Sequence, residues 1–233
     1  MRPPLALAVA QPPCVPYDVE ANAAAHAALV RAAGARVVVF PELSLTGYEL
    51  DAPVLATDEP RLAQLAEACA ATGALALVGA PVGDAGRAYI GMLAVDATGA
   101  RVVYRKMFTT ETEAARFAAG DEPAVLDVDG WRLGLAVCRD TGVPAHAART
   151  VALGVDCYLA GVLQAPDDAA VPEERARLVA ATHRVWVATA SFAGNSGSHY
   201  PRTAGGSGVW RPDGTPVARA GTEPGEVVRA ILR

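Results

Sequence analysis

The segment Gly134-Leu135-Ala136-Val137-Cys138-Arg139-Asp140 changes from apolar to polar at a cysteine. Residues suited to a strand interior alternate from Trp131 to Val137 with mostly small residues between them, which predicts a strand buried on both faces. A thiol at the end of such a strand is held rigidly while its sulfur can face a pocket. Most lone cysteines are small hydrophobic core residues. This segment alone therefore does not decide whether Cys138 is a core residue or a reactive thiol.

Helix and strand patterns alternate on both sides of this segment. Strands are predicted over Leu5–Ala10, Arg36–Phe40, Leu75–Ala80, Tyr89–Val95, Arg101–Arg105, Val125–Val128, Trp131–Val137, Cys157–Ala160, Val185–Ala190, Ser207–Trp210, Thr215–Ala220 and Val227–Leu232. Helices are predicted over Glu20–Ala33, Glu59–Thr72, Ala145–Leu153 and Pro172–Thr182. This order favours an α/β class in which two sheets pack together with helices outside. The sequence contains no linker, repeat or low-complexity tract, so residues 1–233 are predicted to form a single domain.

The composition argues against several classes of partner. The chain has 233 residues, of which 52% are hydrophobic and 19% charged, and its net charge is −5. No basic run occurs, so we expect neither nucleic acid nor an anionic membrane as a partner. No segment approaches the ~18 consecutive apolar residues of a membrane span. Gln11-Pro12-Pro13 interrupts the apolar N-terminal run before a signal-peptide core forms, so we expect a cytoplasmic protein.

The cysteines and histidines do not form a metal-binding pattern. The four cysteines show no CxxC spacing and the four histidines show no HxxxH spacing, so we expect no metal site. Cys69 lies on the apolar face of a predicted helix and Cys157 lies in a predicted buried strand. Both are therefore expected to be core residues.

Three polar residues, Glu42, Lys106 and Cys138, each follow a hydrophobic strand at the point where the chain leaves the core. Open sheets place their ligands at strand ends. Together these residues supply the parts for acyl transfer: a thiol nucleophile, a carboxylate that can take its proton, and an ammonium that can stabilise an oxyanion. No histidine is needed in this scheme, and we do not expect His146, on the helix after the cysteine, to be catalytic.

The motifs around these residues resemble those of the nitrilase superfamily of carbon–nitrogen hydrolases. Phe40-Pro41-Glu42-Leu43 resembles the family's glutamate motif, and Tyr104-Arg105-Lys106 resembles its lysine motif. The segment 135–140, with Pro144 downstream, is similar to its nucleophile motif. The motifs occur in the family's order, and the resemblance covers nearly the whole chain.

A fourth motif adds a second carboxylate. The loop Glu113–Asp121 is similar to the family stretch that supplies another active-site glutamate. The resemblance places this residue at Glu113, or at Glu111 if the loop is shifted.

The resemblance also implies a fold and a mechanism. The implied fold is a four-layer α-β-β-α sandwich of two mixed sheets, which forms a homodimer through its helices and needs no cofactor. The implied mechanism has Cys138 attack the carbonyl or nitrile carbon while Glu42 acts as general base. Lys106 and the backbone N–H of Arg139 then hold the oxyanion, and Glu113 positions the substrate amide and the lysine.

Three further residues are predicted to bind the substrate. Tyr48 follows the glutamate motif, and the guanidinium of Arg139 suits a substrate carboxylate. Asn195 begins a polar loop, residues 195–202, that is expected to form a wall of the pocket.

The sequence departs from the family pattern after the nucleophile. Asp140 is followed by Thr141-Gly142-Val143-Pro144-Ala145, which lacks the family's aromatic residue and glutamate. This change affects the expected substrate more than the expected chemistry. Amidases and carbamoyl hydrolases commonly carry an aspartate two places after the cysteine, so we expect a small linear amide or N-carbamoyl compound as substrate. Hydrolysis of a nitrile, and a non-catalytic binding protein on this fold, stay open as alternatives.

Overall fold

The computed structural model describes residues 2–233 and contains two six-stranded sheets. The first sheet consists, in spatial order, of β14 (Val227–Leu232), β1 (Leu5–Ala10), β2 (Val37–Val39), β3 (Leu75–Asp84), β4 (Arg87–Asp96) and β5 (Gly99–Arg105). The second consists of β13 (Pro216–Arg219), β12 (Gly208–Trp210), β9 (Trp186–Ser191), β8 (Cys157–Val162), β7 (Trp131–Val137) and β6 (Val125–Val128). A small ribbon pairs β10 (Ala193–Gly194) with β11 (Thr203–Ala204).

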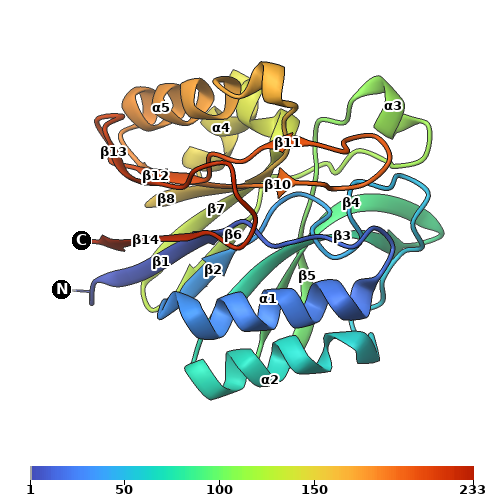
Figure 1. Cartoon of the computed structure of the whole chain (residues 1–233). Helices are drawn as coiled ribbons and strands as arrows, with labels where there is room; N and C mark the ends of the chain where they lie inside the picture. The colour runs from blue at the N-terminus through green and yellow to red at the C-terminus, as the bar shows by residue number, and fades with distance from the viewer. Residues whose placement is uncertain (1) are drawn as a thin grey trace.

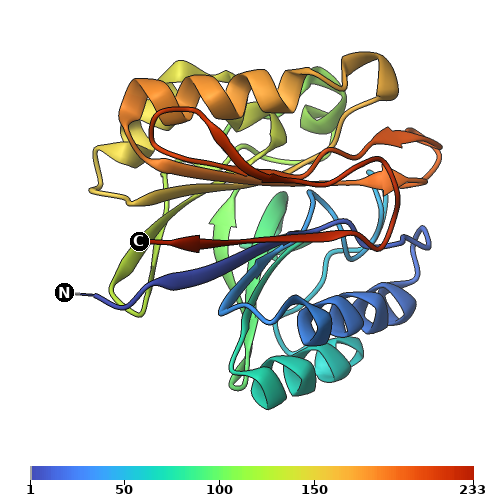
Figure 2. The same cartoon turned by 60° about the vertical axis from the view of Figure 1, so that its left-hand side comes forward.

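Helices cover the outer face of each sheet. Those of the first half are α1 (Val19–Ala33) and α2 (Ala63–Thr72), and those of the second half are α4 (Pro144–Val151) and α5 (Val171–His183). Figures 1 and 2 show α1 and α2 outside the first sheet and α4 and α5 outside the second. The predicted α-β-β-α sandwich is therefore confirmed. The remaining short elements are α3 (Glu111–Ala114) and the 3-10 turns η1 (Pro60–Leu62), η2 (Cys138–Gly142) and η3 (Pro166–Asp168).

Both sheets are mixed, with parallel strands at their centres and antiparallel strands at their edges. β1, β2 and β3 are parallel to one another, as are β7, β8 and β9. Central parallel strands are covered on both faces and consist of continuous apolar runs. The run Val37-Val38-Val39 has this property, and all three side chains are fully buried.

One strand runs past its predicted end. We expected the strand after Gly73 to stop at Ala80, before Pro81, but β3 continues to Asp84. Pro81 pairs with Ile90 of β4, and its carbonyl accepts a hydrogen bond from Leu55 on the opposite side. Its nitrogen faces that same side, where the pairing of β2 with β3 has already ended. A proline is tolerated there because no ladder hydrogen bond is lost.

The main core lies between the two sheets. Its buried side chains come from both sheets and include Leu7, Val39, Leu77, Leu133, Leu135 and Leu159. Separate apolar layers pack between each sheet and its helices. Cys69 and Cys157 are both buried, in agreement with the predicted core roles. Among residues 2–233, no helix has the combination of length and apolarity that crossing a bilayer requires.

Two glycines, one in each sheet, enclose the backbone that follows β2. A Cβ added at Gly79 of β3 would lie 2.3 Å from the nitrogen of Leu43 and 2.5 Å from the carbonyl oxygen of Pro41. A Cβ added at Gly161 of β8 would lie 2.7 Å from the carbonyl oxygen of Phe40 and 3.0 Å from the nitrogen of Glu42. The glutamate motif therefore passes between the sheets at a place where neither neighbouring strand can carry a side chain.

We predict that Gly79→Ala destabilises the fold by about 1–3 kcal/mol, because a methyl group would overlap rigid backbone rather than a movable side chain. The matched control is Gly83→Ala in the same strand, where the nearest atom to the added Cβ is the Val54 side chain at 3.5 Å. This control is expected to change stability by less than about 0.5 kcal/mol. Chemical denaturation of both variants measures the difference, and equal stabilities would contradict the close approach.

Candidate active site

Glu42 is held in the tight turn between the two glycines. The turn is tied to β3, because Leu45 donates to the carbonyl of Gly79 at 3.0 Å and the nitrogen of Gly79 donates to Ser44 Oγ at 3.2 Å. Leu43 within it has a left-handed φ of 52°. The Glu42 side chain is only 1% exposed, so its carboxyl group has a fixed position in the interior.

Lys106 follows β5 and extends the ladder of that strand by one hydrogen bond, from its nitrogen to the carbonyl of Ile90 at 2.8 Å. Its ammonium contacts two carboxylates. Nζ lies 2.6 Å from Glu42 Oε1, and 2.7 and 2.8 Å from the two oxygens of Glu113. All three side chains are 1% exposed, so these ion pairs are screened from water.

The position of Glu113 follows from the one-turn helix α3. Thr110 caps this helix: its hydroxyl accepts from the Glu113 nitrogen at 3.2 Å, and its own nitrogen donates to Glu113 Oε2 at 2.8 Å. This reciprocal capping box fixes the carboxylate. The Tyr48 hydroxyl donates to Glu113 Oε1 at 2.6 Å. Glu111 is exposed on the same helix and lies outside the site, so of the two candidate positions Glu113 is the one beside Lys106.

Cys138 begins the turn η2 directly after β7. Its φ of 39° is in the left-handed region, which costs a non-glycine residue roughly 1–3 kcal/mol and is typical of functional positions. The half-buried thiol lies 3.4 Å from the carbonyl oxygen of Leu163, to which it donates. This backbone conformation directs the sulfur out of the strand and into a cavity.

The four predicted catalytic side chains line one cavity of about 150 Å³. Such a volume is well below the ~300–1,000 Å³ of pockets for drug-sized ligands. The residues that line it are Glu42, Tyr48, Lys106, Thr110, Glu113, Cys138, Arg139, Leu163, Gln164, Arg175 and Tyr200.

Burial and charge set the protonation states in this cavity. Burial raises the pKa of Cys138, with a further contribution from the Glu42 carboxylate, so the resting thiol is protonated at neutral pH. Burial also raises the pKa of Glu42, to about 7, against the opposing effect of Lys106. Burial acts in the same direction on Glu113, but Lys106 and the hydrogen bond from Tyr48 outweigh it and lower the Glu113 pKa. The two carboxyl groups therefore differ: Glu113 is a stable anion, and Glu42 can take up a proton near neutrality.

A buried polar network behind Cys138 was not predicted from the sequence. Asp140 Oδ2 accepts from the Val137 nitrogen at 2.9 Å and from the Tyr104 hydroxyl at 2.7 Å. The Tyr104 oxygen lies 2.8 Å from His146 Nε2, and His146 Nδ1 lies 2.8 Å from the Tyr158 hydroxyl. All donors are used if His146 is neutral with its proton on Nε2, and burial lowers its pKa in agreement. The network braces the turn that carries Cys138.

The predicted substrate-binding residues have different positions. Tyr48 and Arg139 line the cavity. Asn195 does not, because its side chain closes a local turn by accepting from the Gly197 nitrogen at 3.0 Å. Of the loop 195–202, it is Tyr200 that reaches the cavity.

Arg175 is a cavity residue that the sequence analysis missed. It lies on α5, which was predicted as a helix from its pattern, but that pattern does not tell which face of the helix meets the turn η2. Gln164, after β8, was missed for a similar reason.

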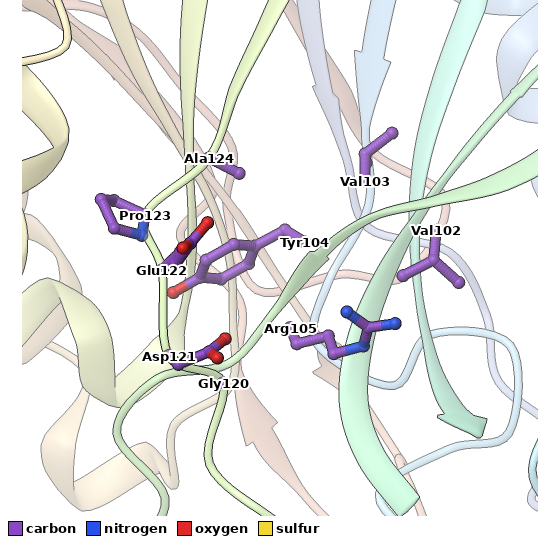
Figure 3. A pocket seen from close by; sticks show the side chains of 9 residues that line it. All are labelled: Val102, Val103, Tyr104, Arg105, Gly120, Asp121, Glu122, Pro123 and Ala124. Carbon is purple, nitrogen blue, oxygen red and sulfur yellow. The ribbon is translucent and has the colours of Figure 1, made fainter. Parts of the chain in front are cut away.

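A second hollow, of about 200 Å³, lies between the end of β5 and the segment 120–124 (Figure 3). Figure 3 shows the Tyr104 ring directed towards that segment and Arg105 directed away from it. None of the four predicted catalytic residues lines this hollow. Among residues 2–233, no group of three or more histidine, cysteine, aspartate or glutamate side chains is arranged to hold a metal ion.

Comparisons with known proteins identify the family of this chain. The model of the family described as carbon-nitrogen hydrolase matches residues 6–232. A relative from Pseudomonas protegens, named "Hydrolase in pqqF 5'region", is 28% identical over 237 residues, which cover 97% of this chain and 82% of the relative.

Two solved structures are similar over almost the whole chain. An amidase from Nesterenkonia sp. superposes with a TM-score of 0.86 at 26% identity, covering 98% of this chain and 90% of that one. Saccharomyces cerevisiae Nit3, a member of branch 10 of the nitrilase superfamily, has a TM-score of 0.86 at 22% identity, with the same coverage, and supports the fold alone. Because the family model spans nearly every residue, the chain belongs to the carbon-nitrogen hydrolase family of the nitrilase superfamily.

Proposed function

We propose that this protein is a cysteine-dependent hydrolase that cleaves the C–N bond of a small linear amide or N-carbamoyl compound. The observation that carries the proposal is the ammonium of Lys106, buried between Glu42 and Glu113 in the wall of the cavity that holds the Cys138 thiol. Burying three charges is a poor way to stabilise a fold, because the desolvation penalty offsets the Coulombic gain. A catalytic use explains why they are present.

In the acylation step, the Cys138 sulfur attacks the substrate carbonyl carbon while Glu42 takes the thiol proton. Lys106 occupies only one oxygen of Glu42, Oε1, so the other oxygen is available to the thiol. Lys106 and the backbone N–H of Arg139 stabilise the oxyanion of the tetrahedral intermediate. Collapse of this intermediate breaks the C–N bond, and Glu42 returns the proton to the departing nitrogen.

In the deacylation step, water attacks the thioester. Glu42 takes a proton from the water, and the same oxyanion donors act again. The sulfur leaves as thiolate and recovers the proton from Glu42, which releases the carboxylic acid and restores the resting state. Glu113 stays ionised throughout and keeps Lys106 positioned and charged.

Both the cavity and the relatives support a small amide as substrate. The volume of about 150 Å³ leaves room for only a few heavy atoms. The Nesterenkonia amidase has been solved in complex with butyramide and with acrylamide, and also with acrylamide added to its active-site cysteine. The missing family glutamate does not weaken the proposal, because its counterpart Ala145 is exposed on α4 and lies outside the cavity.

We predict that Cys138→Ala lowers ammonia release from short amides by at least about 10⁴-fold, as expected for loss of a nucleophile. The matched control is Cys14→Ala, which removes another half-buried thiol that does not line the cavity. Thermal unfolding of both variants checks that the fold is intact. Turnover by the Cys138→Ala protein close to that of wild type would end the nucleophile assignment.

We predict that kcat/KM for a neutral amide falls tenfold per pH unit below about pH 7. Glu42 must be a carboxylate to accept the thiol proton, and burial raises its pKa to about 7, so acidification protonates the base and removes activity. A pH–rate profile of the wild-type protein tests this. An acid limb near the usual glutamate pKa of ~4.3 would show that Glu42 is not the base whose protonation limits the rate.

A panel of matched amides, ureido acids and nitriles separates the proposed function from its alternatives. We predict faster ammonia release from amides or ureido acids than from nitriles of equal length. Faster ammonia release from nitriles would favour nitrile hydrolysis as the function. No ammonia release from any compound of the panel would favour a binding protein on this fold.

A further inference from the structure

Two arginines lie at the cavity of Cys138, and neither forms an ion pair with a carboxylate in the described part of the chain. Arg139 comes from η2 and is exposed, and Arg175 comes from α5, above the second sheet in Figure 1, and is half-buried. Within residues 2–233, the ion pairs of the structure involve neither guanidinium. The acidic groups in the same cavity, Glu42 and Glu113, are already paired with Lys106.

Arg175 has a defined place against the nucleophile turn. A Cβ added at Gly142 would lie 2.7 Å from Arg175 Cζ and 2.8 Å from its Nε, so the guanidinium rests directly on the Gly142 backbone. Gly142 is not in the left-handed region, and its backbone does not require glycine. The missing side chain at this position makes room for the arginine, four residues after the cysteine that attacks the substrate.

We propose that Arg175, together with Arg139, forms an anion subsite of this cavity, so that the substrate is a short amide or N-carbamoyl compound with a carboxylate at its far end. This inference rests on the proposed function. A guanidinium offers a planar set of donors that matches a carboxylate in bidentate geometry. A neutral amide would leave a half-buried positive charge unpaired at one end of the cavity, whereas a carboxylate substrate neutralises it. The volume of about 150 Å³ restricts the spacer to a few carbon atoms.

The test compares two substrates that differ only in the distal group: succinamate, with a carboxylate, and succinamide, with a second amide. We expect wild-type kcat/KM to favour succinamate by at least tenfold. Arg175→Gln is expected to reduce this ratio by about 10–100-fold, mainly through a higher KM for succinamate. A reduction of this size corresponds to the loss of a hydrogen bond to a charged group. Gly142→Ala is expected to reduce the ratio as well, because the added methyl group displaces the guanidinium.

The matched control is Arg177→Gln. Arg177 is exposed on the same helix and lines a different hollow, beside Leu178 and Asp213, so the ratio is expected to stay at the wild-type value. A second pair compares a short N-carbamoyl amino acid with the corresponding N-alkylurea, which lacks the carboxylate. The two pairs together show whether the preferred carboxylate-bearing substrate is an amido acid or a ureido acid. A wild-type ratio near one in both pairs, or a ratio that Arg175→Gln leaves unchanged, would overturn the subsite.

A binding measurement keeps this inference separate from the proposed function. Calorimetry with the Cys138→Ala protein and succinamate requires no turnover. Binding that is lost in the Cys138→Ala/Arg175→Gln double variant supports the subsite even if the wild-type protein hydrolyses none of the compounds. Hydrolysis of succinamide with no preference for succinamate would leave the hydrolase proposal intact and overturn the subsite.

Discussion

The contact on which the site depends is the buried ammonium of Lys106 between Glu42 and Glu113. Three ionised groups with almost no exposure carry a large desolvation cost, and they are tolerated because each distance is 2.6–2.8 Å. The cluster has one more negative than positive charge. A proton arriving at Glu42 therefore neutralises it, which is the change that a base undergoes when it takes a proton from a thiol.

The layered fold brings these groups together from distant parts of the sequence. Glu42 and Lys106 follow strands of the first sheet, whereas Cys138 follows a strand of the second. The cavity is therefore built across the junction of the two sheets, and neither sheet contains a complete site. Glu113 comes from the loop beyond β5, where the capping box of α3, rather than the end of a strand, fixes the position of its carboxylate.

Much of this arrangement could be predicted from the sequence because it depends on local signals. Apolar runs located the strands, and the abrupt polar residues after them located Glu42, Lys106 and Cys138. The orientation of a helix relative to a distant turn has no such signal, and for that reason Arg175 was missed. Asn195 was expected to reach the pocket, but its side chain is used within its own turn. The continuation of β3 through Pro81 depends on which neighbour has already ended, and that is a property of the assembled sheet.

Gly79 and Gly161 leave the backbone at residues 41–43 no free space between the two layers. The position of the Glu42 carboxyl group is thus tied to the thickness of the sandwich. A change of volume in the interlayer core is therefore expected to move that group even when the altered side chain is remote from the cavity. Repacking between the sheets is therefore expected to alter the geometry at Glu42 as well as the stability of the fold.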